Sequence, residues 1–196
     1  MRTVKDPVVR KSEIIAAAME LFQQNGYEKT TVESIINKLG VAKGCFYHHY
    51  RSKEEVFEEC VSNLTRSLMD AYTGILEDTS KPAKQRLMEY IDYNFAASAR
   101  QSGLSEAIHS DGFEDLHAAV VKASAAEILP VFIRLIEQIY EESNHQDRNA
   151  EFSAVALLGA FREIHEHYSH SPKMDLDKLY PLTIDLMENI LDTPFR

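Results

Sequence analysis

The sequence has no tryptophan and only two cysteines, Cys45 and Cys60, among its 196 residues. The two cysteines do not form a CxxC pair, which argues against a framework of disulfides. So few cysteines fit a reducing compartment, and a cytoplasmic location is expected. Residues 1–11 contain no apolar core, so the sequence predicts no secretory signal peptide.

Long hydrophobic runs are also missing. The most apolar stretch, residues 118–140, is interrupted by Lys122, Glu127, Pro130 and Arg134, so it is not expected to cross a membrane. No segment shows the alternation of a β-strand, an internal repeat or low complexity. Hydrophobic residues make up 44% of the chain, an ordinary globular value, and the length suffices for one or two small domains with a core.

Helical spacing of apolar residues dominates the chain and predicts an all-α fold of about nine helices. The expected helices cover residues 10–25, 30–39, 42–50, 53–75, 82–100, 104–109, 113–142, 149–168 and 175–191. Pro130 is expected to kink the long helix that contains it, and Pro181 to mark where the last helix properly starts. The helix over residues 53–75 is long enough to leave a small N-terminal domain, so Cys60, Leu64 and Leu68 are expected to pack on the C-terminal domain.

Two short helices joined by a tight turn predict a helix-turn-helix at residues 30–50. One face of the first helix is apolar, with residues at offsets i, i+3, i+4 and i+7, namely Val32, Ile35, Ile36 and Leu39. Thr30 or Thr31 is expected to cap this helix, with Glu33 completing a capping box with Thr30. Gly40 stands where a left-handed residue ends a helix. In a helix-turn-helix the second helix usually enters the major groove of DNA.

Residues 14–56 resemble the DNA-binding domain of the TetR family of bacterial transcriptional regulators. The matching positions are Ala16–Ala18, Leu21–Phe22, Asn25–Tyr27, Thr30–Val32, Ile35, Gly40–Val41, Lys43–Gly44, Phe46–Tyr47, Tyr50 and Ser52–Glu54. Two positions depart from the family pattern: Cys45 replaces the usual Thr or Ser, and Tyr50 replaces the usual Phe. The resemblance implies a transcriptional regulator, most often a repressor, and not an enzyme.

A set of seven residues is predicted to face DNA. In TetR-like proteins the corresponding positions do so, and the residue types fit, because Lys supplies charge, Gly permits close backbone approach, and hydroxyl or imidazole groups bond phosphates or bases. Phe46 and Tyr50 are expected to be core aromatics instead. The predicted DNA-binding residues are Thr31, Lys43, Gly44, Cys45, Tyr47, His48 and Lys53.

The charge is divided unevenly along the chain. Residues 1–53 carry a net charge of +4 and residues 54–196 a net charge of −14, within a total of −10. Phosphate neutralisation needs Lys and Arg, while an acidic remainder is repelled by DNA. The predicted domains are therefore a DNA-binding domain at residues 1–53 and a domain for ligand binding and dimerisation at residues 54–196.

In TetR-like folds the middle helices surround a ligand cavity, which here implies a small, largely apolar effector and no cofactor. A few polar groups near apolar stripes are what such a cavity uses to orient its ligand. Ordinary core positions are the alternative for each residue. The candidates are Asn94, Phe95, Ser98, His109, Phe113, His117, Phe132 and Phe161.

A homodimer is expected through the helices over residues 149–168 and 175–191, which would form a four-helix bundle with a second copy. Small or apolar residues in the first of these helices would allow close approach, namely Ala154, Ala156, Leu157, Gly159 and Ala160.

Two other function classes remain open at this stage. One is a DNA-binding protein without an effector. The other is a small metal-dependent enzyme or metal sensor that uses Glu163, His167 and His170, which share a helix face at i, i+4 and i+7; a polar stripe is the simpler interpretation. Cys45 beside His48 and His49 lacks an orienting third group, which favours a neutral replacement over a nucleophile.

Overall fold

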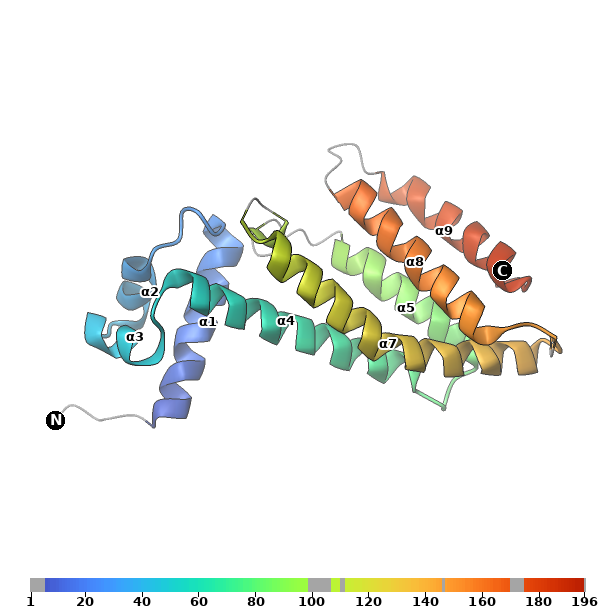
Figure 1. The fold of residues 1–196 in the computed structure, drawn as a ribbon, viewed down its shortest axis with the longest axis horizontal. Helices are drawn as coiled ribbons and strands as arrows, with labels where there is room; N and C mark the ends of the chain where they lie inside the picture. The colour runs from blue at the N-terminus through green and yellow to red at the C-terminus, as the bar shows by residue number, and fades with distance from the viewer. Residues whose placement is uncertain (1–5, 99–106, 110–111, 146, 170–174, 196) are drawn as a thin grey trace. The chain divides into compact units, whose positions relative to one another are not determined.

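The computed structural model describes residues 6–98, 107–109, 112–145, 147–169 and 175–195. These residues form eight helices and no strand, which confirms the all-α prediction (Figure 1). The helices are α1 Pro7–Asn25, α2 Val32–Leu39, α3 Lys43–His49, α4 Lys53–Leu76, α5 Ala83–Ser98, α7 Glu114–Glu142, α8 Ala150–Ser169 and α9 Leu176–Leu191. The expected total of about nine was slightly too high for this part of the chain; the short helix expected over 104–109 lies mostly outside it. No helix among the described residues is long and apolar enough to cross a membrane.

The chain packs as two compact units. The N-terminal unit comprises the described parts of residues 1–67 and 101–121, and the C-terminal unit those of 68–100 and 122–196. Each unit therefore combines segments that are distant in the sequence, and both α4 and α7 contribute to each unit. The predicted domains at 1–53 and 54–196 are a functional division, which stays a prediction.

The N-terminal unit is built around interlocked aromatic rings. Phe57 of α4 lies 5.4 Å from Phe22 of α1, 4.8 Å from Tyr27 and 4.5 Å from Phe113, measured between ring centroids. Helix α1 starts earlier than predicted, because the Asp6 side chain accepts a hydrogen bond from the Val8 backbone N–H and Pro7 occupies the first turn. Residues 7–9, which lie before the helix predicted from residue 10, are therefore helical.

The first half of α4 belongs to the core of the N-terminal unit, which corrects the expectation for Cys60 and Leu64. Cys60 is fully buried among the residues of α1 to α3, and its thiol lies 3.8 Å from the backbone carbonyl of Ile15. Leu64 packs against the same cluster. The apolar stripe of α4 is continuous in the sequence, and it changes its partner along its length.

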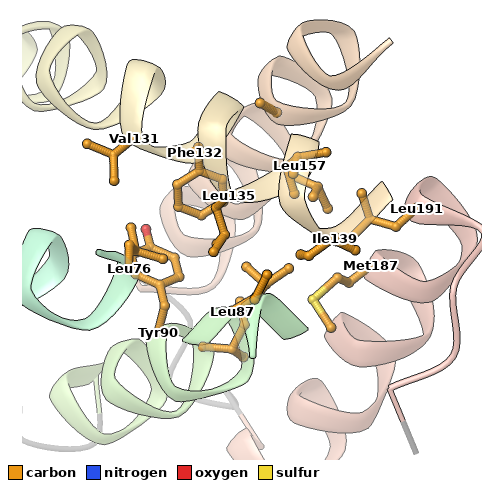
Figure 2. Close-up of a cluster of buried hydrophobic side chains, with 14 of the residues drawn as sticks. Leu76, Leu87, Tyr90, Val131, Phe132, Leu135, Ile139, Leu157, Met187 and Leu191 are labelled. Atoms are coloured by element: carbon orange, nitrogen blue, oxygen red, sulfur yellow. The ribbon is translucent and has the colours of Figure 1, made fainter. Parts of the chain in front are cut away.

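The C-terminal unit packs α5, α8, α9 and most of α7 around the end of α4. Its core is drawn in Figure 2 and includes Leu76, Leu87, Tyr90, Val131, Phe132, Leu135, Ile139, Leu157, Met187 and Leu191. Helix α9 runs from Leu176 to Leu191, which confirms the helix predicted over residues 175–191, and it does not start at Pro181 as the proline had suggested. A proline removes one backbone hydrogen bond, yet the helix includes the turn before Pro181. Helix α7 likewise has a proline inside it, because it runs without interruption from Glu114 through Pro130 to Glu142.

Candidate DNA-binding surface and ligand pocket

The start of α2 is fixed by a reciprocal cap. The Thr31 side chain accepts a hydrogen bond from the Ser34 backbone N–H, and the Ser34 hydroxyl accepts one from the Thr31 backbone N–H. The box predicted between Thr30 and Glu33 is therefore wrong by one residue. Thr30 is instead buried, and its hydroxyl donates to the backbone carbonyls of Leu21 and Gly26. These bonds tie the loop before α2 to the end of α1.

Gly40 makes the turn between α2 and α3. Its backbone lies in the left-handed region, at φ 64° and ψ 34°, which a glycine adopts without steric cost. Its N–H and that of Val41 donate to carbonyls in the last turn of α2, so the helix ends with satisfied groups. The predicted turn is thereby confirmed, and α3 follows after two residues.

Helix α3 has a buried face and an exposed face. Phe46 and Tyr50 are 0% and 2% exposed, and both pack in the core of the N-terminal unit, as predicted. Tyr47 is 46% exposed on the other face, and Lys43, Gly44 and His48 are exposed as well. The structure therefore gathers four of the seven predicted DNA-binding residues on one accessible side of a single short helix.

The exposed cation of this face is held only loosely. The Lys43 ammonium lies 3.2 Å from the Glu33 carboxylate and 5.8 Å from the centre of the Tyr47 ring. Both side chains of the ion pair are more than 60% exposed, so water and salt screen their attraction. The pKa of Glu33 is lowered, first by the hydrogen bond from its own backbone N–H and then by Lys43. A phosphate could compete for Lys43 at little cost.

Gly44 is not required by the packing of the protein. A Cβ added at this position would meet no atom within 4 Å, and the backbone has an ordinary helical conformation. A glycine inside a helix destabilises it by about 0.5–1 kcal/mol relative to alanine. Its place on the exposed face leaves the backbone of α3 open to close approach from outside.

Lys53, predicted to face DNA, is half-buried and already engaged. Its ammonium donates to the backbone carbonyl of Tyr27 at 3.1 Å and lies 3.7 Å from the centre of the Tyr27 ring. The Tyr27 hydroxyl in turn donates to the Glu54 carboxylate at 2.9 Å. Lys53 therefore helps to join the start of α4 to the end of α1, and its contact with DNA stays a prediction.

The two cysteines differ in environment. Cys45 is half-buried on α3 between the exposed and the buried face. Cys60 is buried, and burial raises the pKa of its thiol to about 12, which keeps it protonated and unreactive at neutral pH. Neither side chain forms a disulfide.

A pocket opens among α5, α8 and α9 of the C-terminal unit, with a cavity volume of about 90 Å³. Its wall is mainly apolar and aromatic, and a few polar side chains complete it. The lining residues are Tyr90, Ile91, Asn94, Phe95, Phe161, Ile164, His165, Leu176, Leu179 and Thr183. This mixture is the usual composition of a site for a small organic ligand.

The predicted ligand residues are divided between the two units. Asn94, Phe95 and Phe161 line the pocket together. Phe132 is fully buried in the core, with its ring 5.0 Å from that of Tyr90. Phe113, His109 and His117 lie in the N-terminal unit, where the two histidine rings are 4.4 Å apart. The side chain of Ser98 lies outside the described part of the structure.

The polar groups of the pocket are anchored by neighbours. The Tyr72 hydroxyl donates to the Asn94 side-chain oxygen at 2.7 Å, and the Asn94 amide donates to the Tyr90 backbone carbonyl at 2.8 Å. Burial raises the pKa of Tyr72 to about 12, so it remains a hydrogen-bond donor at neutral pH. Asn94 is thereby held in one orientation.

Sequence reasoning missed the contribution of α9 to the pocket. Leu176, Leu179 and Thr183 line it, although they lie on a helix that we assigned to dimerisation and core. They stand at offsets i, i+3 and i+7, so a single helix face was visible in the sequence. Nothing in that spacing indicated that the face borders a cavity.

The metal site suggested by Glu163, His167 and His170 is not seen in the part of the chain that the structure describes. Glu163 and His167 are exposed on α8, and Glu163 pairs with Arg162 at 2.9 Å. His170 lies outside the described residues.

Comparison with known proteins places residues 14–60 in the family described as bacterial regulatory proteins, tetR family. The HTH-type transcriptional repressor KstR2 of Mycolicibacterium smegmatis is 31% identical over 83 residues, which cover 42% of this chain and 40% of that protein. The chain thus spans only about 40% of the length of such relatives. A probable acrEF/envCD operon repressor of Escherichia coli K12 is 24% identical over 193 residues, covering 94% of this chain and 87% of the relative.

Solved structures share the fold over nearly the whole chain. The fatty acid degradation regulator FadR from Bacillus halodurans has a TM-score of 0.65 at 19% identity, covering 94% of this chain and 96% of its own. SmeT of Stenotrophomonas maltophilia in complex with triclosan has a TM-score of 0.67 at 18% identity, covering 92% and 90%. Residues 14–60 thus match the family described as bacterial regulatory proteins, tetR family, and the fold of the chain is that of solved transcriptional regulators.

Proposed function

We propose that this protein is a DNA-binding transcriptional regulator, and specifically a cytoplasmic repressor that a small, largely apolar ligand releases from its operator. The observation that carries the proposal is the exposed face of α3, where Lys43, Gly44, Tyr47 and His48 lie together behind a well-capped α2. Several relatives of the same family are named as repressors. We therefore propose a regulatory and not an enzymatic role, because the segment that matches the family, residues 14–60, contains this exposed face.

The first experiment tests DNA binding. DNA selected from a random pool by the purified protein supplies an operator, and fluorescence anisotropy then measures affinity over a range of salt concentrations. We expect Lys43→Ala to weaken binding to all sequences and to lower the salt slope by about one, for one lost phosphate contact. Tyr47→Ala is also expected to lose affinity. Lys178→Ala on α9 is the matched control, since it removes the same charge from the C-terminal unit.

The placement of α3 would be wrong if Lys43→Ala and Tyr47→Ala both bound the selected operator as tightly as Lys178→Ala. A loss in Lys178→Ala as large as that in Lys43→Ala would indicate a general charge effect. Only a loss confined to the α3 variants supports the proposal.

We further propose a homodimer through α8 and α9. Two large apolar side chains of α8, Phe152 and Val155, are 74% and 52% exposed, and Leu182 of α9 is 63% exposed. A Cβ added at Gly159, one turn further along α8, would meet no atom of the same chain within 4 Å. A row of exposed apolar groups on two adjacent helices suits burial against a second copy.

Two residues named in the sequence argument for this dimer have another role. Ala154 and Leu157 are fully buried in the core of their own unit, so they do not face a partner. The exposed apolar residues of α8, Phe152 and Val155, lie on a different face of the helix from Ala154 and Leu157.

Light scattering and sedimentation at micromolar concentration test the dimer. We expect Phe152→Arg to give a monomer, while Tyr93→Arg on α5, another exposed aromatic of the same unit, stays dimeric. A parent protein that is monomeric would contradict the proposal. So would a Phe152→Arg variant that remains as dimeric as the control.

The pocket is the proposed effector site. Its volume of about 90 Å³ is far below the roughly 300–1,000 Å³ of typical ligand sites, so a guest must displace side chains such as Phe95 or Phe161. Ligand binding would then favour one packing of α5 against α8 and α9. It can release DNA only to the extent that it prefers that state.

A thermal-shift screen of apolar compounds identifies a stabilising ligand, and its effect on operator affinity is then measured. We expect Leu179→Phe, which fills the pocket, to abolish the response while leaving operator binding intact. Leu129→Phe on α7, half-buried and outside the pocket, is the control and keeps the response. An unchanged response in Leu179→Phe would place the effector elsewhere. A broad screen without any stabilising compound would favour an effector-independent regulator.

A further inference from the structure

Arg86 on α5 is a buried cation with neutral partners. Its side chain is 4% exposed in the C-terminal unit. One terminal nitrogen donates to the Leu76 backbone carbonyl at 2.6 Å, and the other donates to the Gln138 side-chain oxygen of α7. Among the described residues, no carboxylate forms an ion pair with it, and its Nε–H is buried without a hydrogen-bond acceptor. Buried charges are normally paired, because removing an ion from water is unfavourable unless a partner compensates.

The carbonyl of Leu76 offsets part of this cost. It belongs to the last turn of α4, where the helix dipole is negative and free carbonyls accept hydrogen bonds from Arg side chains. This contact explains one edge of the guanidinium group. It does not explain the other edge, formed by Nε and the nitrogen that faces Gln138, which is the edge that grips a carboxylate with two parallel hydrogen bonds.

Arg86 lines a second pocket, separate from the one among α5, α8 and α9. This pocket has a cavity volume of about 210 Å³, which greatly exceeds the ~30 Å³ that one water occupies. Its walls combine apolar side chains with polar ones from α4, the following loop, α5 and α7. The lining residues are Leu76, Glu77, Thr79, Arg86, Val131, Arg134, Leu135 and Gln138.

The charges of this pocket leave one positive charge unbalanced. At the rim, Arg134 and Glu77 neutralise each other across 2.5 Å, and their side chains are 54% and 49% exposed. Arg86 is then the remaining ionic group of the lining, and it is the buried one. An anion that entered would meet a desolvated guanidinium group, where a charge-assisted hydrogen bond is stronger than at the surface.

We propose that the Arg86 pocket binds a small organic monocarboxylate, whose carboxylate pairs with Arg86 and whose short aliphatic part lies against Leu76, Val131 and Leu135. The apolar wall selects an organic acid over a bare inorganic anion. Gln138 is the residue that a carboxylate would displace from Arg86. The inference does not rest on the proposed effector pocket, since the two sites share no lining residue.

Isothermal titration calorimetry with butyrate tests the site at constant ionic strength, with butyramide as the uncharged isostere and inorganic phosphate as a second anion. We expect saturable binding of butyrate only, and at least tenfold weaker binding to Arg86→Met. Arg148→Met is the matched control, because Arg148 pairs with Asp192 on the surface of the same unit and lies outside the pocket. Its affinity for butyrate should equal that of the parent.

A second variant keeps the test decisive if Arg86→Met fails to fold. Val131→Phe narrows the pocket and leaves the arginine in place, so it should also weaken butyrate binding. Absence of saturable binding by the parent protein would overturn the proposal. Equal binding of butyramide would show an apolar site, and binding of phosphate alone would overturn the assignment to carboxylates. Undiminished butyrate binding in the folded variants would place the site elsewhere.

Discussion

Aromatic side chains close the core of one unit and leave a cavity in the other. In the N-terminal unit Phe22, Tyr27, Phe57 and Phe113 meet at centroid distances of 4.5–5.7 Å, so each of these rings packs against another. In the C-terminal unit Tyr90, Phe95 and Phe161 line a space of about 90 Å³. A closed aromatic core holds α3 in one position, whereas rings that border a cavity can repack around a guest.

The two units also differ in how far their buried polar groups are satisfied by hydrogen bonds. The Thr30 hydroxyl, buried near α2, donates to two backbone carbonyls and so fixes a loop. Arg86, buried in the C-terminal unit, keeps one donor without an acceptor among the described residues. Fully satisfied polar groups rigidify a core, while an unsatisfied donor indicates a place where a ligand would be stabilised.

The largest effect is expected from removing an aromatic ring in each unit. Phe57→Ala opens a cavity in the closed core, and a loss of about 3–5 kcal/mol in the free energy of unfolding is expected. Phe95→Ala enlarges a cavity that already exists, so its expected loss is below about 2 kcal/mol. Urea denaturation followed by circular dichroism measures both. Equal losses in the two variants would contradict the contrast between the units.

The next effect compares two buried threonines. Thr30→Val removes a buried hydroxyl that donates to the carbonyls of Leu21 and Gly26, and it should lower the free energy of unfolding by about 1–3 kcal/mol. Thr183→Val removes only a hydroxyl that donates to the Leu179 carbonyl, four residues earlier on the same helix, and about 0.5 kcal/mol or less is expected. Thermal unfolding of both variants decides. A larger loss in Thr183→Val would mean that its hydroxyl has a role that the contact with Leu179 does not reveal.

Two glycines of the helix-turn-helix, Gly40 and Gly44, are expected to change stability with opposite signs when each is replaced by alanine. Gly40→Ala forces a side chain into the left-handed region and should destabilise the protein by about 1–2 kcal/mol. Gly44→Ala should stabilise it by about 0.5–1 kcal/mol through helix propensity, yet weaken operator binding by blocking close approach. Thermal melts and anisotropy titrations separate the two readouts. An unchanged operator affinity in Gly44→Ala would remove the case for backbone contact there.

The smallest effect concerns acid stability. The pKa of Glu54 is lowered first by the hydrogen bond from its own backbone N–H, then by Ser52 and by Tyr27. A lowered pKa stabilises the fold above the ordinary glutamate value, and this stability is lost as pH falls through the folded value. Tyr27→Phe removes one donor, so the difference from the parent should be about 1 kcal/mol or less at pH 7 and should shrink towards pH 3. Urea titrations at several pH values measure it, and a difference that grew on acidification would contradict this sign.

The sequence predicted the helix-turn-helix with only local errors. The apolar offsets of α2, the position of Gly40 and the burial of Phe46 and Tyr50 were all visible, because each depends on residues within four or five positions of one another. Of the two threonines predicted as possible caps, Thr31 is the cap for a tertiary reason. Thr30 is drawn into the core by carbonyls at the end of α1, which leaves Thr31 at the helix start.

The C-terminal unit was predicted as helices but not as a site. Helical spacing marked Leu176 and Leu179 as inward-facing, and it marked Cys60 and Leu64 equally well, yet it did not say which partner each would meet. Cys60 packs on α1, and the two leucines border the pocket. The hydrophobic effect favours burial of an apolar side chain but not contact with any particular neighbour. The residues that it meets therefore depend on how the helices are arranged.

The sequence by itself determined the all-α class, the turn at Gly40 and the resemblance of the N-terminal segment to the tetR family, because helix periodicity, turn chemistry and a local motif are properties of neighbouring residues. The tertiary structure alone decided that α9 borders the pocket and that Arg86 is buried. The contacts behind both join distant positions: Tyr180 donates to Asp92 across 88 residues, and Arg86 to Gln138 across 52 residues. Periodicity within one helix carries no information about such pairs, and only the packing of several helices brings them together.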